Sequence, residues 1–294
     1  MKLFKKLSKG EDIYNVSVDI TNLGMPLSNI SRELNTSENI ISNNLDLCME
    51  TETHYKLFNS STIDEWKPKD FKMETTTVWN FKDRGNWATH NGKYRGNWSP
   101  YIPRNLILRY SKEGDIVLDP FLGSGTTLIE TKLLKRKGIG VDINPKAIDI
   151  SKENLRFNKN IEYEPTIYNL DSRHLNIIED KSIDLICAHP PYANIIKYSK
   201  DIIGDLSLLD IDDFLAEILI VAKELFRILK RNKYCAVLIG FYVMQQFLKA
   251  GFILKENIIK EQHNCQATGF WYKKSIDYNF LLIAHEYLFV FRKP

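Results

Sequence analysis

The sequence of 294 residues has few cysteines, no long apolar run and little net charge. Its four cysteines include no Cys-x-x-Cys pair, which argues against a zinc site or a disulfide framework and favours a reducing cytoplasm. No stretch is apolar enough to cross a membrane, and the basic N-terminus lacks the apolar core of a signal peptide. The net charge of +3 permits nucleic-acid binding but does not argue for it.

From about residue 115 onward, short apolar runs alternate with segments of helical spacing. The first four apolar runs each lead into a polar residue: Asp119, Asp142, Asp171 and His189. Helical spacing is found in three segments: 126–134, 145–157 and 211–230. Such alternation predicts an α/β fold with a doubly wound sheet, closed by an antiparallel end strand within residues 280–291. Functional residues are then expected at the carboxyl ends of the parallel strands.

The first 75 residues are polar and carry no strand pattern, so a mainly helical N-terminal extension is predicted there, followed by a catalytic domain over 76–294. Within the extension, the apolar spacing of residues 27–45 fits two short helices with a break at Asn35 and Thr36 and a cap at Ser37. This pair is either a helix-turn-helix that enters a DNA groove or a helical hairpin that only packs.

Residues 115–127 read DIVLDPFLGSGTT, which predicts a strand, a tight glycine turn and the start of a helix. Gly123 and Gly125 lack the Cβ that would keep a ligand away from the backbone. The helix start offers unpaired N–H groups to an anion. By itself, this turn is compatible with nicotinamide, flavin and S-adenosylmethionine (SAM) proteins.

A second motif narrows the choice, because the buried strand at 182–188 leads into His189-Pro-Pro-Tyr192. Two consecutive prolines fix the backbone and remove two N–H donors, so only carbonyl acceptors remain beside an aromatic ring. That arrangement suits a planar base that carries an amino group.

Two aromatic and basic segments are candidates for stacking against bases. Residues 79–98 are rich in tryptophan and arginine between glycines, and residues 262–274 are polar, then aromatic, then basic. For residues 79–98, the alternative is that the tryptophans cap the core. For residues 262–274, a loop over the site is favoured, and the alternative is a plain surface hairpin. The candidate substrate contacts are Trp79, Arg84, Trp87, Tyr94, Arg95, Trp98, Phe270, Trp271 and Lys273.

The DPFLGSGTT turn at 119–127, together with His189-Pro-Pro-Tyr192, resembles the SAM-dependent DNA amino-methyltransferases, which modify cytosine-N4 or adenine-N6. The resemblance covers roughly residues 79–294. It implies a Rossmann-like SAM-dependent methyltransferase sheet, SAM as cofactor, no metal, and double-stranded DNA as partner, with a restriction endonuclease as a possible second partner.

The resemblance also implies a cofactor site. Gly123 and Gly125 would lie against the methionine part of SAM. Asp119 and the helix start would hold its amino and carboxylate groups. Asp142 would accept hydrogen bonds from the ribose hydroxyls. Asp171 and the Ser172 backbone would bind the adenine edge. The implied cofactor residues are Pro100, Tyr101, Asp119, Pro120, Phe121, Gly123, Ser124, Gly125, Thr126, Thr127, Asp142, Ile143, Asp171 and Ser172.

The implied catalytic residues are His189, Pro190, Pro191 and Tyr192. Acceptors at His189 and the Pro190 carbonyl would activate the exocyclic amine, and Tyr192 would stack on a base flipped out of the duplex. The family usually has Asp, Asn or Ser at the first position of this motif. Histidine there, with the DPFxGSGTT form of the turn, favours cytosine-N4 over adenine-N6.

Three other functions compete with this interpretation. A tRNA guanine-N2 methyltransferase shares both motifs, but normally carries a larger, strand-rich N-terminal RNA-binding domain that residues 1–75 do not show. A helix-turn-helix regulator with a degenerate sheet domain would not need acids at the strand ends. A nicotinamide dehydrogenase would leave the Pro-Pro-Tyr motif unexplained.

Overall fold

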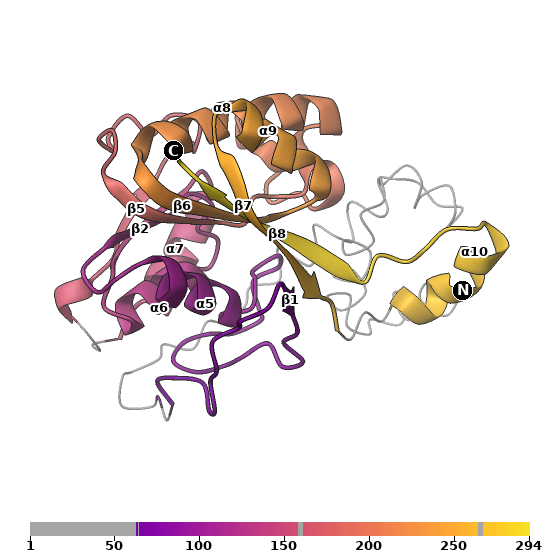
Figure 1. The fold of residues 1–294 in the computed structure, drawn as a ribbon, viewed down its shortest axis with the longest axis horizontal. Coiled ribbons are helices and arrows are strands. Elements are labelled where there is room, and N and C mark those ends of the chain that lie inside the picture. Colours follow the sequence, from indigo (N-terminus) through magenta and orange to yellow (C-terminus); the bar gives the residue numbers. More distant parts are fainter. Residues whose placement is uncertain (1–62, 64, 158–160, 264–266) are drawn as a thin grey trace.

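The computed structural model describes residues 63, 65–157, 161–263 and 267–294 (Figure 1). The predicted helical extension, with its candidate helix-turn-helix at 27–45, therefore lies outside the described residues except for 63 and 65–75. Those residues form turns and extended chain. The domain boundary at 75/76 stays a prediction.

The described residues form one eight-stranded sheet with the strand order β1-β7-β8-β6-β5-β2-β3-β4. The strands are β1 (Val78–Trp79), β2 (Ile116–Asp119), β3 (Lys137–Asp142), β4 (Thr166–Asn169), β5 (Ile183–Ala188), β6 (Leu229–Ile239), β7 (Ile253–Glu261) and β8 (His285–Arg292). All pairings are parallel except those of β8, which runs antiparallel to both β6 and β7. The predicted doubly wound sheet with an antiparallel strand at its end is confirmed, with the last strand of the chain inserted near that edge.

Helices cover both faces of the sheet (Figure 1). One face carries α5 (Tyr101–Tyr110), α6 (Thr126–Leu133) and α7 (Pro145–Asn154), and the other carries α8 (Ile211–Ile228) and α9 (Met244–Lys249). A further helix, α10 (Ala267–Asp277), joins β7 to β8 and projects away from the sheet. The loop predicted at 262–274 is therefore mostly helical, and the chain reverses there through a helix.

The central strand β5 shows how the core is divided. All six of its residues are buried, as expected for a parallel strand covered on both faces. Leu185 and Cys187 pack in the cluster that contains residues of α5, whereas Ile186 and Ala188 pack in the cluster that contains residues of α8. The alternation follows from the two-residue period of a strand, and it leaves the next residue, His189, at the carboxyl edge of the sheet.

Local sequence explains where the helices next to this edge begin. Gly125 precedes α6 with φ of +86°, and a Cβ there would lie 3.1 Å from the Cβ of Ser151. Asn144 caps α7 by accepting a hydrogen bond from the Lys146 N–H, with Pro145 in the first helical turn. α6 therefore begins just after the glycine turn that follows β2, and two residues separate the end of β3 from the start of α7.

A buried glutamate joins the tryptophan-rich segment to these helices. Glu130 on α6 accepts hydrogen bonds from Trp87 Nε1 at 2.7 Å and from Arg104 Nη1 at 2.8 Å, and His90 Nε2 lies 2.8 Å from its Oε1. The Glu130 side chain is fully buried. The segment that contains Trp87 and His90 is therefore anchored to α5 and α6 through one carboxylate.

Replacing Glu130 with glutamine is expected to lower the free energy of unfolding by about 1–3 kcal/mol, because the Arg104 guanidinium would lose its charged partner in a buried place. Denaturant unfolding measures the change. Glu113→Gln is the matched control, since that glutamate is exposed and its ion pair with Lys135 lies at the surface. Equal stability of the two variants would contradict the anchoring role.

Candidate active site at the carboxyl edge of the sheet

Asp142, at the end of β3, holds the glycine turn. Its Oδ2 accepts from the Gly123 N–H at 2.8 Å and its Oδ1 accepts from the Asn144 N–H at 2.9 Å. Burial raises the pKa of Asp142 to about 6, against the lowering effect of these two hydrogen bonds. Each oxygen can accept further hydrogen bonds, and Asp142 lines the cleft described below.

Asp119, at the end of β2, closes the other side of the same turn. It accepts from the Phe121 N–H at 3.0 Å and from the hydroxyl of Thr127 on α6. Burial raises the pKa of Asp119 to about 7, and the two hydrogen bonds only partly oppose that effect. The turn between β2 and α6 is thus fixed by two carboxylates from adjacent strands.

Asp171, which follows β4, is already paired with a cation. The Arg173 Nε lies 3.0 Å from each carboxylate oxygen. Burial would raise the pKa of Asp171, but the hydrogen bonds and charge of Arg173 outweigh it and hold that pKa below its usual value. The neighbouring Ser172 donates its hydroxyl to the Pro120 carbonyl. Asp171 and Ser172 line the cleft, whereas Arg173 does not. The sequence pattern did not indicate that Arg173 pairs with the acid of the predicted adenine site.

His189 stands at the end of β5 between two aromatic rings. The Trp98 ring stacks on it with centroids 5.6 Å apart and planes at 19°, and the Tyr192 ring meets it edge-on at 5.8 Å and 84°. Its Nε2 is buried and has no hydrogen-bond partner among the described residues. Burial lowers the pKa of His189 to about 4. The ring is therefore neutral at physiological pH, and one of its nitrogens can accept a hydrogen bond.

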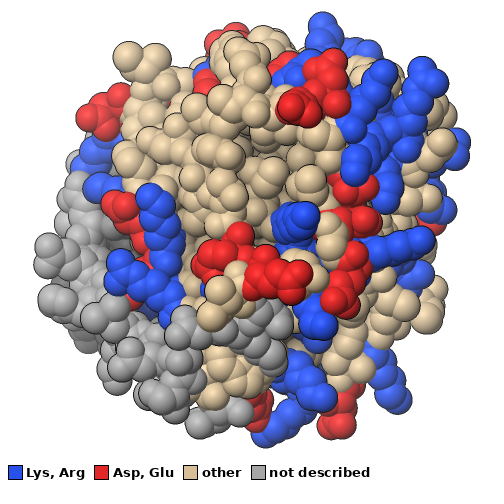
Figure 2. Space-filling view, turned by 90° about the vertical axis from the view of Figure 1, so that its left-hand side faces the viewer, with Lys and Arg blue, Asp and Glu red and all other residues tan. Residues whose placement is uncertain are grey.

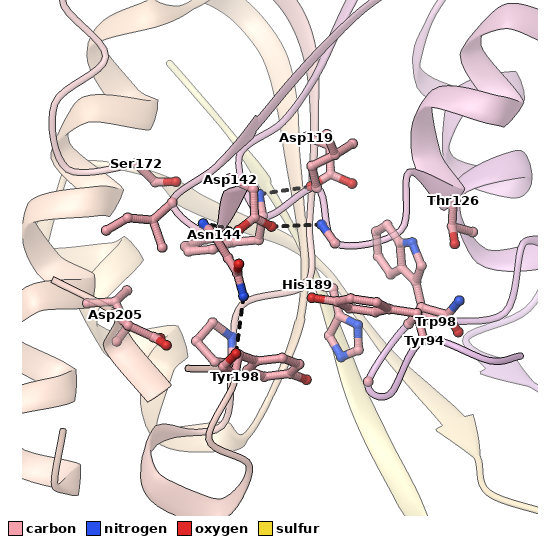
Figure 3. Close-up of a pocket in the computed structure, with 18 of the residues that line it drawn as sticks. Tyr94, Trp98, Asp119, Thr126, Asp142, Asn144, Ser172, His189, Tyr198 and Asp205 are labelled. Atoms are coloured by element: carbon pink, nitrogen blue, oxygen red, sulfur yellow. Dashed lines mark hydrogen bonds between the residues drawn. The ribbon is translucent and has the colours of Figure 1, made fainter. Parts of the chain in front are cut away.

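These groups surround one open cleft of about 800 Å³. Figure 3 shows His189, Trp98 and Tyr94 on one side, Ser172 and Asp205 on the other, and Asp142 between them. The predicted residues that line the cleft are Tyr94, Trp98, Asp119, Phe121, Gly123, Thr126, Asp142, Ile143, Asp171, Ser172, His189 and Pro191. The two motifs of the sequence, far apart in the chain, therefore face one cavity.

The other predicted site residues do not line this cleft. They are Pro100, Tyr101, Pro120, Ser124, Gly125, Thr127, Pro190, Tyr192, Trp79, Arg84, Trp87, Arg95, Trp271 and Lys273. Two of them contact lining residues: Thr127 donates its hydroxyl to Asp119, and the Pro120 carbonyl accepts from the Ser172 hydroxyl. The Tyr192 ring lies edge-on to the His189 ring, which lines the cleft. The side chain of Phe270 lies outside the described residues.

Several of the candidate base-stacking residues are corrected by the structure. Trp79 and Trp87 are each 2% exposed and pack in the core, so the alternative that tryptophans cap the core holds for these two. Arg95 is also buried, and Arg84 donates to Asn97 Oδ1 at 2.6 Å, which braces its own loop. Trp98 alone of the three tryptophans in this segment lines the cleft.

The second basic-aromatic segment lies elsewhere. Trp271 and Lys273 are on α10, which projects from the sheet, and Trp271 is only 5% exposed and meets Phe280 edge-on. This helix does not line the cleft. Its predicted position as a loop over the site is therefore wrong.

Sequence reasoning missed a segment that follows the Pro-Pro-Tyr motif and the residues that meet it. The missed lining residues are Gly96, Asn97, Leu122, Asn144, Tyr198, Gly204, Asp205 and Leu206. Tyr198 stacks on Tyr94 with centroids 6.3 Å apart, and its carbonyl accepts from the Asn144 side chain. The available signal was the cap at Asp205, which accepts from the Ser207 N–H and marks an ordered turn.

Charge does not single out a nucleic-acid face among the described residues seen in Figure 2. Acidic and basic side chains alternate over the middle of this face, and Lys and Arg gather along its right-hand side. None of the described helices is long and apolar enough to cross a membrane.

Two family models match parts of the chain. A family model described as "DNA methylase" matches residues 33–153, and one described as "RMKL-like, methyltransferase domain" matches residues 106–206. The first match contains the glycine turn, Asp119 and Asp142. These matches support the resemblance to the DNA amino-methyltransferase family. They imply SAM as the cofactor.

Individual relatives match this chain over short segments. It is 43% identical over 81 residues to the type II methyltransferase M.HpaI of Haemophilus parainfluenzae, which is 27% of this chain and 26% of that protein. It is 35% identical over 100 residues to a tRNA (guanine(10)-N2)-dimethyltransferase of Methanothermobacter thermautotrophicus, which is 34% of this chain and 29% of that protein. The chain thus spans less than a third of the length of these relatives.

Among solved structures, this chain is similar to TrmN from Thermus thermophilus. The TM-score is 0.49 at 19% sequence identity, and the similarity covers 68% of this chain and 50% of that chain.

Proposed function

We propose that this chain transfers the methyl group of SAM to the exocyclic amine of a base flipped out of double-stranded DNA, with cytosine-N4 as the favoured target. The observation that carries the proposal is the single cleft in which the glycine turn and His189 face each other. A glycine turn with strand-end acids suits the cofactor, and an uncharged acceptor beside aromatic rings suits an amino-bearing base.

The residues of the cleft fit SAM. Gly123 has φ of +51° and presents backbone without a Cβ. The half-buried Asp142 and the buried Asp119 offer carboxylate oxygens to the hydroxyl and ammonium groups of the cofactor. Phe121, Ile143 and Leu206 supply apolar walls. The bound cofactor supplies an electrophilic sulfonium methyl.

The chain's own residues prepare the amine. An exocyclic amine is a poor nucleophile because its lone pair is delocalised into the ring. Acceptors at His189 and at the Pro190 carbonyl hold its hydrogens and stabilise the positive charge that develops on nitrogen. Trp98 keeps the His189 ring in place by stacking. Burial keeps His189 neutral, so it does not repel that charge.

The choice of base rests on position 189. Histidine replaces the Asp, Asn or Ser of the family motif, and with the DPFLGSGTT turn it favours cytosine-N4. Adenine-N6 is the alternative within DNA. A tRNA guanine-N2 activity is a second candidate, which the tRNA (guanine(10)-N2)-dimethyltransferase relative favours. A restriction endonuclease partner stays a prediction.

The deciding experiment offers labelled SAM with duplex DNA and with bulk tRNA in separate reactions. The nucleic acid is then digested to nucleosides, which are identified by mass spectrometry. The expected product is 4-methylcytosine in DNA. The appearance of 6-methyladenine would keep the mechanism and change the base, whereas label only in tRNA would overturn the DNA proposal.

A further inference from the structure

Three side chains form a chain of contacts behind the Pro-Pro-Tyr motif. The Tyr192 hydroxyl donates to Glu286 Oε1 at 3.1 Å, and Lys260 Nζ donates to Glu286 Oε2 at 2.8 Å. Lys260 on β7 and Glu286 on β8 are direct cross-strand partners in the sheet. Tyr192 and Glu286 are 94 residues apart in sequence, and nothing in the sequence motifs connects them.

The Glu286 carboxylate is a fixed acceptor. The side chains of Lys260 and Glu286 are each 18% exposed. Burial would raise the pKa of Glu286, but the charge of Lys260 and the hydrogen bonds of Lys260 and Tyr192 hold it below its usual value. An ionised carboxylate of this kind, on a strand paired on both sides, has little freedom to move.

Tyr192, in contrast, lies on a short irregular segment. It precedes the single turn Ala193–Ile195, and Ala193 has φ of +46°. Its backbone belongs to no strand ladder, and its carbonyl accepts a hydrogen bond from the Ile195 N–H of that turn at 3.1 Å. The hydroxyl contact with Glu286 joins the outer end of the ring to the sheet, while the inner end lies edge-on to His189.

We propose that Glu286, held by Lys260, is a positioning residue that fixes the Tyr192 ring edge-on to His189 and so holds the His189 ring, which lines the cleft, in place for the target base. This inference rests on the proposed function and deepens it, because it assigns a role to the β7–β8 pair. Glu286 acts through Tyr192 and does not touch the reacting atoms. A ring free to turn would let the amine drift from its acceptors, and small misplacements of this kind are costly in rate.

The test replaces the ion pair by apolar residues, in the double variant Lys260→Met/Glu286→Leu. Removing both charges avoids leaving one buried and unpaired, so folding should be retained. The single-turnover rate of methyl transfer to DNA is expected to fall roughly 10- to 100-fold, with unchanged SAM affinity. Tyr192→Phe should show a similar loss, and adding it to the double variant should cause no further loss, because all three changes break the same contact.

Glu261→Gln is the matched control. It lies next to Lys260 on β7, on the opposite face of the strand, and accepts from the Asn80 side chain. Its rate should equal that of the unmodified chain. The positioning role is overturned if the double variant transfers methyl at the full rate, or if its loss multiplies with that of Tyr192→Phe.

A measurement without DNA separates this inference from the proposed function. A 3-fluorotyrosine at position 192 should give one ¹⁹F resonance that shifts and broadens in the Lys260→Met/Glu286→Leu background. An unchanged resonance would overturn the inference whatever the activity. A changed resonance in a chain that never methylates DNA would show that the contact exists but the proposed function fails, and the positioning role would fall with it.

Discussion

Replacing His189 with alanine is expected to lower the rate of methyl transfer by roughly 100- to 1,000-fold, because the variant removes an acceptor aimed at charge that develops in the transition state. SAM affinity should not change, since the cofactor contacts come from the turn between β2 and α6 and from β3. Single-turnover transfer to DNA and equilibrium SAM binding measure the two quantities. Tyr192→Ala should likewise lose most transfer and keep SAM binding.

His189→Asn is the informative companion variant. Asparagine is one of the residues that the family uses at this position, and its side-chain oxygen can accept a hydrogen bond. Partial recovery of the rate relative to alanine is therefore expected. Full activity of His189→Ala would contradict the assignment of His189 as an acceptor.

The pH profile gives an independent check on the same residue. Because burial lowers the pKa of His189 to about 4, the acceptor form persists from neutral pH down to that value. The rate with SAM saturating should therefore show no inflection near 6.5 from this residue, and should fall only as the pH approaches 4. An inflection near 6.5 that disappears in His189→Asn would contradict the buried, neutral imidazole.

Asp142→Ala is expected to weaken SAM binding by roughly 100-fold, through the loss of charged hydrogen bonds to the ribose and of the acceptor that holds the glycine turn. The Gly123 and Asn144 N–H groups would lose their partner at the same time. Isothermal titration with SAM, without any nucleic acid, measures the change. Asp149→Ala, at an exposed position on α7, is the control and should bind SAM normally.

The same carboxyl should make SAM affinity depend on pH. Burial raises the pKa of Asp142 to about 6, so the ionised acceptor is complete above that value and is lost as pH falls through it. Affinity should therefore decline between pH 7 and pH 5. The stability of the fold without SAM depends on pH in the opposite sense. Because the folded-state pKa of Asp142 is raised, this group favours the folded form at low pH, and that stability is lost as the pH rises through 6. Affinity that is flat over this range would contradict the ribose role.

Local physical chemistry made the cofactor half of the site predictable. Gly125 needs positive φ, Asn144 and Pro145 start a helix, and apolar runs of strand length end at Asp119 and Asp142. Each of these signals acts within a few residues. Parallel strands bring their carboxyl ends to one edge, so the acids and His189 had to meet once the doubly wound sheet formed.

The aromatic half was not predictable in the same way. Trp79, Trp87 and Trp98 occur in one segment without periodicity, and their positions depend on partners far along the chain. Trp87 is buried where its Nε1 donates to Glu130 on α6. Trp98 lies at the cleft, where it stacks on His189 after β5. No local rule distinguishes such residues, since each outcome depends on long-range packing.

By itself, the sequence determined the doubly wound sheet, the glycine turn and the set of acids at the strand ends, because strand period, turn chemistry and helix capping are local. Only the tertiary structure decided which aromatic rings line the cleft and that Arg173 pairs with Asp171. It also decided that Glu286, on the β7–β8 pair, accepts a hydrogen bond from Tyr192. Those contacts join side chains that the fold, and not the spacing along the chain, brings within hydrogen-bond distance.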